Sequence, residues 1–254
     1  MVRDIFRVLV DHNAIKGEII FPSSKGAGGK GCVILCHGIP GGTRDLRDPG
    51  YAWLAEGLAN DGYCAVIFNF RGAGESEGDF DMRGWMDDLR AVAAVVRSRI
   101  GLPPVLWGFS AGGAVSVCVV AEDNDFAGLM LCGCPAEFSG ALADGGADRF
   151  LEHARAIGIV RRADFPPDRA AWADGFRIVC PEKKIAGCGA LPKLVIHGDD
   201  DDVVPVAHAY RLYDRALAPK ELLVIKGGGH RLRLNEEAME AAREWLGRWS
   251  FVGG

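Results

Sequence analysis

The sequence predicts an α/β fold, a doubly wound and mostly parallel sheet with helices on both faces. Short, almost wholly apolar segments rich in Val, Ile, Leu and Cys recur along the chain, as in strands that are buried on both sides of a parallel sheet. Segments with a helical spacing of apolar residues lie between several of them. This repeated strand–helix order is typical of a doubly wound sheet. A chain of 254 residues suits one such domain.

The first two strands are predicted at residues 5–11 and 15–22, around His12 and Asn13. The glycine-rich stretch 23–31 is expected to form a surface hairpin, because it lacks the spacing of a phosphate-binding loop. The remaining strands are predicted at residues 32–36, 64–70, 105–109, 128–134, 194–197 and 222–225.

Helical spacing runs from Trp85 to Val96 and again from Ala238 to Trp249, where Asn235 stands at the position of an N-cap. The run 100–121 carries no charge and has the length of a membrane span. Prolines and glycines interrupt it, so a strand, a tight turn and a buried helix explain it better.

Residues 138–189 break the alternation of strands and helices. They hold two helical patterns, around 150–157 and 169–176, and are too long for an ordinary connection. We therefore predict one domain over residues 1–254, with a small helical cap insertion at about 138–189 over the carboxyl edge of the sheet. Phe138, Phe150 and Trp172 are candidates to line an apolar substrate pocket, although such aromatic residues more often pack an insertion onto its sheet.

Composition argues against several partners. The net charge is −5 and no basic block is present, so neither nucleic acid nor an anionic membrane is expected to bind. The N-terminus lacks the features of a signal peptide, and eight cysteines without one indicate a cytoplasmic protein with reduced thiols. Cys132 and Cys134 lack a matching second pair of ligands, so no metal site is expected.

Gly108-Phe-Ser110-Ala-Gly112 is the leading catalytic motif. A serine between glycines is common in ordinary turns, but this one lies between a predicted strand and a helical segment. A sharp turn there exposes the Ser110 hydroxyl, and the glycines let strand and helix approach each other. The N–H groups at the helix start point near the same hydroxyl. Ser110 is the candidate nucleophile.

The segment His37-Gly-Ile39-Pro-Gly-Gly42 closes the strand 32–36. A turn rich in glycine and proline can end any strand. Here it is also placed to complete an oxyanion hole, in which the N–H groups of Ile39 and Ala111 would hold the developing negative oxygen. His37 itself is expected to be structural, because it precedes the turn.

A group of carboxylates and a histidine follow two later strands. The four consecutive aspartates 199–202 come after strand 194–197, and at least three of them are expected to be solvated. His230 follows strand 222–225 and three glycines, on a loop C-terminal to both other candidates. Serine, acid and histidine thus occur in an order that is known for catalytic triads.

From about Cys32 to Trp249 the chain resembles the α/β-hydrolases, near the serine aminopeptidase-like and dienelactone-hydrolase-like branches. The resemblance rests on the Ser110 motif and on His37-Gly-x-x-Gly41, Phe68-Asn-Phe-Arg-Gly-x-Gly-x-Ser-x-Gly78, His197-Gly-x-x-Asp-x-x-Val-Pro205 and Gly229-His230. It implies that Asp201 is the catalytic acid among the four aspartates. It also implies that the segment 71–78 is a structural turn beside the site. Residues 138–189 match no known cap.

These observations predict a serine hydrolase that cleaves small to medium carboxylic esters, acting on a small-molecule acyl substrate and needing no cofactor or metal. Ser110 would attack the acyl carbon, His230 would take its proton, and Asp201 would orient His230. The same triad could cleave amides, thioesters or carbon–carbon bonds. A non-catalytic binding protein on the same scaffold is a further alternative. Such proteins commonly lack a triad member, whereas this chain has candidates for all three. A dinucleotide site at residues 72–78 is disfavoured by an acidic residue, Glu77, where the motif needs its last glycine.

Overall fold

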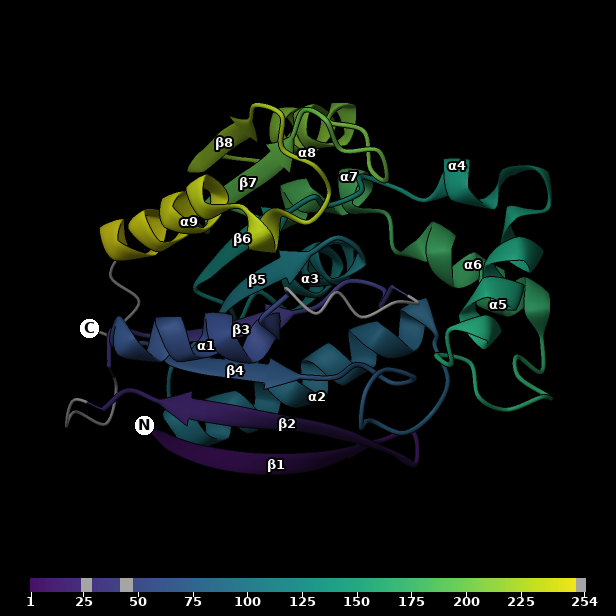
Figure 1. Ribbon diagram of the computed structural model, residues 1–254, viewed down its shortest axis with the longest axis horizontal. Helices are drawn as coiled ribbons and strands as arrows, with labels where there is room; N and C mark the ends of the chain where they lie inside the picture. The colour runs from purple at the N-terminus through teal and green to yellow at the C-terminus, as the bar shows by residue number, and fades with distance from the viewer. Residues whose placement is uncertain (24–28, 42–47, 250–254) are drawn as a thin grey trace.

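A computed structural model describes residues 1–23, 29–41 and 48–249 of the chain. In these ranges eight strands form one sheet, in the order β1-β2-β4-β3-β5-β6-β7-β8 (Figure 1). β1 is antiparallel to β2 and β2 to β4, whereas the six strands β3 to β8 pair in parallel. This is the mostly parallel sheet that the sequence predicts. The strands are β1 (Val2–Val10), β2 (Asn13–Phe21), β3 (Cys32–Cys36), β4 (Cys64–Phe68), β5 (Val105–Phe109), β6 (Gly128–Cys132), β7 (Lys193–Gly198) and β8 (Lys220–Ile225).

The hairpin of β1 and β2 turns at Asp11 and His12, one residue earlier than the sequence suggested. Both residues have positive φ, 48° and 67°, as the tight two-residue hairpin turn requires. The glycine-rich hairpin predicted at 23–31 lies largely at residues 24–28, outside the described residues.

Two predicted strands are shorter than expected. The segment 64–70 leaves the sheet after Phe68, and the segment 128–134 leaves it after Cys132. The Phe70 N–H donates to Nε2 of His37 (3.1 Å) instead of to a neighbouring strand. Gly133 adopts a φ of +57°, which turns the chain out of the sheet. Both segments therefore continue as loops at the carboxyl edge of the sheet.

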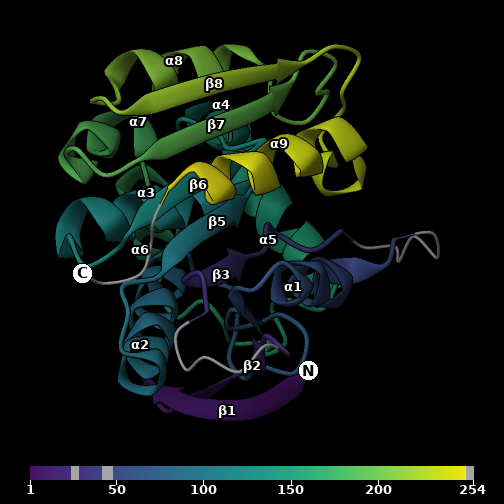
Figure 2. The ribbon, with the colours of Figure 1, turned by 90° about the vertical axis from the view of Figure 1, so that its left-hand side faces the viewer.

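Helices cover both faces of the sheet (Figure 2). The buried side chains of α2, α3 and α8 belong to one hydrophobic core, and those of α1 and α9 to a second core on the opposite face. The uncharged run 100–121 divides into β5 and α3, and none of the described helices is long and apolar enough to cross a membrane. The helices outside the β6–β7 connection are α1 (Gly50–Asn60), α2 (Met82–Ile100), α3 (Ala111–Asp123), α8 (Ala207–Arg215) and α9 (Glu236–Arg248).

The last helix begins where the sequence predicted. The side chain of Asn235 accepts a hydrogen bond from the Ala238 N–H (2.9 Å) and so caps α9. The η3 turn (Leu232–Leu234) comes directly before this cap and links α9 to the loop that follows β8.

The connection between β6 and β7 carries four short helices, of which α4, α5 and α6 lie beyond the carboxyl ends of the strands and α7 packs beside α3 and α8 (Figure 1). An aromatic cluster joins α5 and α6 to the loop before α2: the rings of Phe150, Trp172 and Phe176 lie 5.3–6.4 Å from the ring of Phe80. Trp172 also donates its Nε1–H to the carbonyl of Phe80 (3.0 Å). The elements are α4 (Ser139–Leu142), η1 (Ala143–Gly145), α5 (Gly146–Ala156), α6 (Arg169–Ile178), α7 (Pro181–Lys184) and η2 (Ile185–Cys188).

Candidate active site

The topology places a switch point at the carboxyl ends of β3 and β5. From β3 the chain passes to β4 on one side, and it then returns to β5 on the other side. The connections that leave these two strands diverge, and such switch points are where open α/β sheets bind their ligands. The loop after β3 carries residues 37–41, and the turn after β5 carries Ser110.

Ser110 occupies a strained turn between β5 and α3. Its φ of 50° and ψ of −126° are unusual for a residue with a side chain. The turn depends on the flanking glycines: a Cβ on Gly108 would lie 2.3 Å from Gly113 Cα, and one on Gly112 would lie 2.3 Å from the carbonyl oxygen of Cys36. The close approach of strand and helix that the sequence predicted is confirmed.

Hydrogen bonds join Ser110, His230 and Asp201, which come from three separate loops. Nε2 of His230 lies 3.1 Å from Oγ of Ser110, and Nδ1 of His230 lies 2.8 Å from Oδ2 of Asp201. The Asp201 side chain is fully buried, whereas the His230 ring is 21% exposed. The acceptor on Asp201 fixes the proton on Nδ1, so Nε2 of the neutral ring is left to accept a proton from the hydroxyl.

Asp201 is held by more than the His230 ring. Its Oδ1 accepts the N–H groups of Val203 (2.9 Å) and Val204 (2.8 Å). Burial of Asp201 opposes its charge, but hydrogen bonds from His197 and His230 outweigh burial and hold the pKa of the carboxyl well below its usual value. Asp201 is therefore a fixed anion beside the imidazole.

The other three aspartates are exposed, as expected for at least three of the four. Two of them shape the loop that carries His230. Oδ1 of Asp199 accepts the Gly227 N–H (2.5 Å), and the Asp200 N–H donates to the Gly228 carbonyl (3.0 Å). The loops after β7 and β8 are thus joined just before His230.

The sequence analysis did not assign a role to His197 in β7, which lies against Asp201. Its ring is fully buried, and Nε2 is 2.7 Å from the carbonyl oxygen of Val204 and 3.3 Å from Oδ2 of Asp201. Since a carbonyl only accepts, Nε2 carries the proton. Nδ1 is buried, with no hydrogen-bond partner among the described residues. The signal in the sequence was the spacing His197-Gly-x-x-Asp201, used there only as part of the resemblance.

The loop after β3 is fixed by His37. Its Nε2 accepts the Phe70 N–H, and its Nδ1–H donates to the carbonyl of Gly38 (2.7 Å). Burial lowers the pKa of His37 to about 4, so the ring is neutral at physiological pH. His37 therefore has the structural role that was expected.

The same loop packs directly against the candidate nucleophile. A Cβ on Gly38 would lie 2.9 Å from Cβ of Ser110, so a side chain at Gly38 would displace the serine. Ile39 follows Gly38 and is half-buried. Ala111 is the first residue of α3, where an N–H has no acceptor within the helix. Gly42, the last residue of the predicted oxyanion segment, lies outside the described residues.

A second contact that sequence reasoning missed joins this region to the loop after His230. Both guanidinium Nη atoms of Arg233 bind the carboxylate of Asp48, which precedes α1. The same guanidinium lies 4.5 Å from the centre of the Tyr51 ring. Asp48 and Arg233 are 185 residues apart, and no pattern in the sequence connects them.

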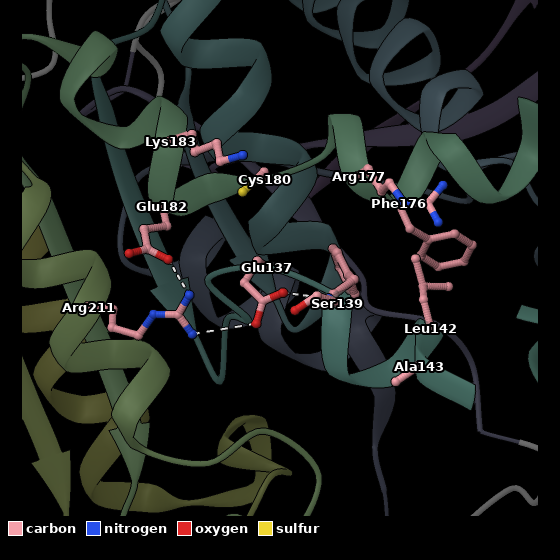
Figure 3. Close-up of a pocket in the computed structure, with 11 residues that line it drawn as sticks. Glu137, Ser139, Leu142, Ala143, Phe176, Arg177, Cys180, Glu182, Lys183 and Arg211 are labelled. Atoms are coloured by element: carbon pink, nitrogen blue, oxygen red, sulfur yellow. Dashed lines mark hydrogen bonds and ion pairs between the residues drawn. The ribbon is translucent and has the colours of Figure 1, made fainter. Parts of the chain in front are cut away.

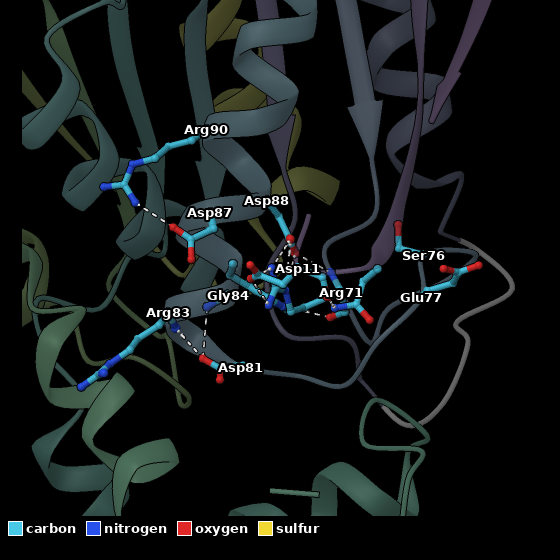
Figure 4. A network of polar contacts seen from close by, with 12 residues as sticks. Asp11, Arg71, Ser76, Glu77, Asp81, Arg83, Gly84, Asp87, Asp88 and Arg90 are labelled. Atoms are coloured by element: carbon cyan, nitrogen blue, oxygen red, sulfur yellow. Dashed lines mark hydrogen bonds and ion pairs between the residues drawn. The ribbon is translucent and has the colours of Figure 1, made fainter. Parts of the chain in front are cut away.

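A buried polar network fixes the segment 71–78 against α2 and the β1–β2 hairpin (Figure 4). Arg71 donates from its backbone N–H and from Nη2 to the fully buried carboxylate of Asp88, both at 2.8 Å. The Gly72 N–H donates to the Glu77 carbonyl (3.2 Å), so the turn closes on itself. This is the arrangement of a structural turn and not of a cradle for phosphate.

The three aromatic residues proposed to line a substrate pocket lie in different surroundings. Phe138 lines a cavity of about 560 Å³ beneath α4, α6 and α7 (Figure 3). Phe150 and Trp172 do not line this cavity and belong to the aromatic cluster around Phe80. Phe176, from the same cluster, does line it.

All eight cysteines are free thiols and buried. Burial raises the pKa of Cys132, for example, to about 12, so this thiol is neutral and unreactive. Its Sγ accepts a hydrogen bond from Nε1 of Trp107 (3.2 Å). Within the described ranges, no group of three or more His, Cys, Asp or Glu side chains is placed to hold a metal ion.

Comparison with known proteins agrees with this architecture. A family model described as the alpha/beta hydrolase fold matches residues 31–155. The chain is 27% identical over 224 residues to the uncharacterized protein YfhR of Escherichia coli K12, an alignment that covers 87% of this chain and 70% of that protein.

Two solved structures extend the likeness in fold over almost the whole chain. The α/β hydrolase GrgF from a Penicillium species superimposes with a TM-score of 0.74 at 17% identity, covering 98% of this chain and 99% of its own. An α/β serine hydrolase homologue from Coxiella burnetii gives a TM-score of 0.63 at 24% identity, with 98% and 97% coverage. Because the matched family model spans β3 to β6 with the Ser110 turn between them, we conclude that the chain belongs to the α/β-hydrolase superfamily.

Proposed function

We propose that the protein is a serine hydrolase that cleaves small to medium carboxylic esters through an acyl-enzyme on Ser110. The observation that supports this most strongly is the chain of hydrogen bonds from Oγ of Ser110 through His230 to Asp201. A serine nucleophile is activated by an imidazole base, which a carboxylate orients. Ser110 in its strained turn, His230 and the buried Asp201 would supply these three parts.

In the proposed reaction, Oγ of Ser110 attacks the acyl carbon while its proton passes to Nε2 of His230. The imidazolium is stabilised by the Asp201 carboxylate, whose lowered pKa keeps it charged. The tetrahedral intermediate collapses as His230 returns the proton to the leaving alcohol. Water then attacks the acyl-enzyme, with His230 again as base, and releases the acid and the free serine.

The N–H groups of Ile39 and Ala111 are the proposed oxyanion hole. Gly38, which precedes Ile39, packs against Ser110, and Ala111 follows Ser110 at the start of α3. Both N–H groups therefore belong to segments that adjoin the nucleophile. Removal of one such donor typically costs about 3–4 kcal/mol of transition-state stabilisation.

Esters are proposed over amides and long-chain lipids. An ester needs less help from His230, because an alcohol leaves more easily than an amine. The helices between β6 and β7 are short, and their aromatic side chains pack against Phe80 and so are not free to line a groove. A long acyl chain would require a long apolar groove. Amidase, thioesterase and carbon–carbon hydrolase activities on the same triad are the alternatives, and matched substrates distinguish them.

The test is covalent labelling combined with turnover. A fluorophosphonate should label Ser110, and Ser110→Ala should abolish labelling and lower kcat for aryl esters by about 10⁶-fold while the protein stays folded. Ser98→Ala removes an exposed hydroxyl on α2 and serves as the matched control. Labelling of another serine, or faster cleavage of anilides than of the matching esters, would overturn the proposal.

A further inference from the structure

The first strand of the sheet has an open edge. β1 is the outermost strand, and its only neighbour in the sheet is β2. None of the described elements lies beyond it in either view of the molecule (Figure 1 and Figure 2). The strand has nine residues, and all of them pair with β2 in one unbroken register. A long, regular edge of this kind is a template for a further strand, and most proteins shorten or cover it.

The backbone groups along this edge point out of the sheet. The Ala14 N–H in β2 donates to the Glu77 side chain (2.9 Å) and therefore faces away from β1. Ala14 lies opposite Leu9, and directly opposite residues of an antiparallel pair either both face each other or both face away, so Leu9 faces outward. This orientation alternates along a strand, so the odd-numbered residues 3–9 all direct their N–H and C=O groups outward. No hydrogen bond within the described ranges uses these groups.

The side chains at the edge are more apolar than an exposed strand usually allows. Ile5 is 79% exposed and Leu9 is 67% exposed. Arg3 and Arg7 alternate with them, and both arginines form ion pairs with glutamates of the same molecule. At the opposite edge of the sheet, the aliphatic residues of β8 are half-buried or buried. The two edges therefore differ, and only β1 exposes large aliphatic side chains.

Helix α2 adds a second uncovered surface along the same edge. An open groove of about 510 Å³ is lined by Val8 of β1 and by four residues of α2, namely Ala91, Ala94, Val95 and Ser98. Their spacing places these four residues on one face of the helix, here called the α2 stripe. The stripe is small and uncharged, so a second helix can pack closely against it. Arg99 also lines the groove and is paired with Asp4.

A partner for this edge must present both an open strand and a small-residue helix face in the same arrangement. A second copy of the chain presents this combination. A two-fold axis perpendicular to the sheet would set β1 antiparallel to β1 of the second copy. The same axis would leave both α2 helices on one face of the joined sheet, with the two α2 stripes opposite each other.

The charges of β1 select the register of such a pair. Outward-facing residues must lie opposite each other, so the axis passes through a residue near the middle of the strand. An axis at Ile5 would place Arg3 opposite Arg7, and an axis at Arg7 would place this arginine opposite itself. Like charges directly opposite each other destabilise a strand pair. An axis at Phe6 avoids both contacts, because it places Arg3 opposite Leu9. It also places Ile5 opposite Arg7.

We propose that the protein forms a two-fold symmetric dimer through the edges of β1, centred on Phe6, in which the two sheets become one. The interface consists of the outward backbone groups of β1, the exposed Ile5 and Leu9 side chains and the α2 stripe. This inference goes beyond the proposed esterase function and does not depend on it.

The test is sedimentation equilibrium over a series of protein concentrations. The unmodified protein should show a monomer–dimer equilibrium without larger assemblies. Ile5→Lys places a cation opposite Arg7 in both halves of the interface and should raise the dimer dissociation constant about ten-fold. Ile5→Glu removes the same apolar side chain but carries the opposite charge, so its dimer should be about ten-fold tighter than that of Ile5→Lys. Higher salt should narrow this difference, and Ala94→Arg in the α2 stripe should also weaken the dimer.

The matched control is Leu217→Lys, which changes an exposed leucine between α8 and β8, at the other end of the sheet. It should leave the dissociation constant unchanged, and thermal unfolding should show that every variant is folded. A monomer throughout the series would overturn the inference. So would a dimer that neither Ile5→Lys nor Ala94→Arg weakens. Equal dissociation constants for Ile5→Lys and Ile5→Glu would reject the pairing centred on Phe6.

Amide hydrogen exchange, measured by NMR, tests the edge directly. The amides of Ile5 and Arg7 face outward, so their exchange should slow as the protein concentration rises and the dimer forms. The amides of Phe6 and Val8 face β2 and should be protected at every concentration, which makes them internal controls. If the Ile5 and Arg7 amides exchange equally fast in monomer and dimer, β1 is not the interface.

Discussion

Asp201 differs from its three acidic neighbours in what surrounds it. Its side chain is fully buried and receives two backbone N–H groups and the His230 ring, whereas Asp199, Asp200 and Asp202 are exposed. We expect Asp201→Asn to lower kcat by about 10⁴-fold, because the amide stabilises the wrong imidazole tautomer. Asn at each of the other three positions should change kcat far less. Steady-state kinetics with one aryl ester measures all four, and a larger loss at Asp200 or Asp202 would contradict the assignment of the acid.

His197 should act on the reaction through Asp201. Replacement by Phe removes the N–H that faces the carboxylate and leaves a hydrogen bond to a charged group unmade, which corresponds to roughly 10- to 100-fold. We expect that loss in kcat with KM little changed, and partial recovery in His197→Gln, whose amide can place an N–H near the position of Nε2. If KM and kcat fell together, or if His197→Gln recovered no activity, His197 would only pack in the core and would not position Asp201.

At the scale of single residues, sequence reasoning succeeded where a local motif carries the chemistry. The Ser110 motif and the loop position of His230 are readable from neighbouring residues, and the structure brings both together with Asp201. His197 was not recognised, because its role depends on which atoms surround its ring in the folded protein.

At the scale of elements, the strands were the most predictable part of the fold. Continuous apolar runs mark strands that are covered on both faces, and β3 and β5 have the predicted bounds. Of the helices with eight or more residues, α1 and α8 were not predicted. α8 buries only Ala209 and Leu212, too few for a long apolar stripe, whereas α1 buries Leu54, Ala55, Leu58 and Ala59 at a helical spacing that the sequence analysis did not recognise.

His37, in the loop after β3, should make the free energy of unfolding depend on pH. Burial lowers the pKa of His37 to about 4, whereas an unfolded imidazole titrates near ~6.5. Above about pH 6.5 neither state binds this proton, and the contribution of the neutral ring to stability is complete. As the pH falls towards 4, the unfolded chain takes up a proton that the folded chain excludes, so stability is lost.

The expected loss from His37 between pH 6.5 and 4 is about 3 kcal/mol of unfolding free energy. Urea unfolding of the unmodified protein and of His37→Gln at both pH values measures it, because other groups titrate equally in the two proteins. The stability advantage of the unmodified protein should shrink by about that amount at the lower pH. An advantage that stays constant would show that the His37 ring is protonated in the folded state.

At the scale of the whole molecule, the order of the strands places the site. The strand order reverses between β3 and β5, and the loops after β3, β5, β7 and β8 meet at the carboxyl ends of these strands. A parallel α/β sheet could be predicted from the alternating elements, and with it a site at the carboxyl edge. The contacts that join the two ends of the chain could not be predicted, because they link residues far apart in the sequence without a shared motif.

The contact between Asp48 and Arg233 is such a link, and we expect it to hold the His230 loop against the segment before α1. Both side chains are largely buried, and Arg233 also lies over the Tyr51 ring. Asp48→Asn and Arg233→Gln should each lower kcat/KM for an aryl ester by about ten-fold, as expected when one partner of a partly buried charge pair is lost. Because both changes break the same contact, the double variant should lose about as much as either single one. The matched control is the ion pair of Asp61 and Arg243, which joins the end of α1 to α9 and involves no loop of the site. Arg243→Gln should leave kcat/KM unchanged, and losses that multiply in the Asp48→Asn/Arg233→Gln variant would show that the two residues act independently.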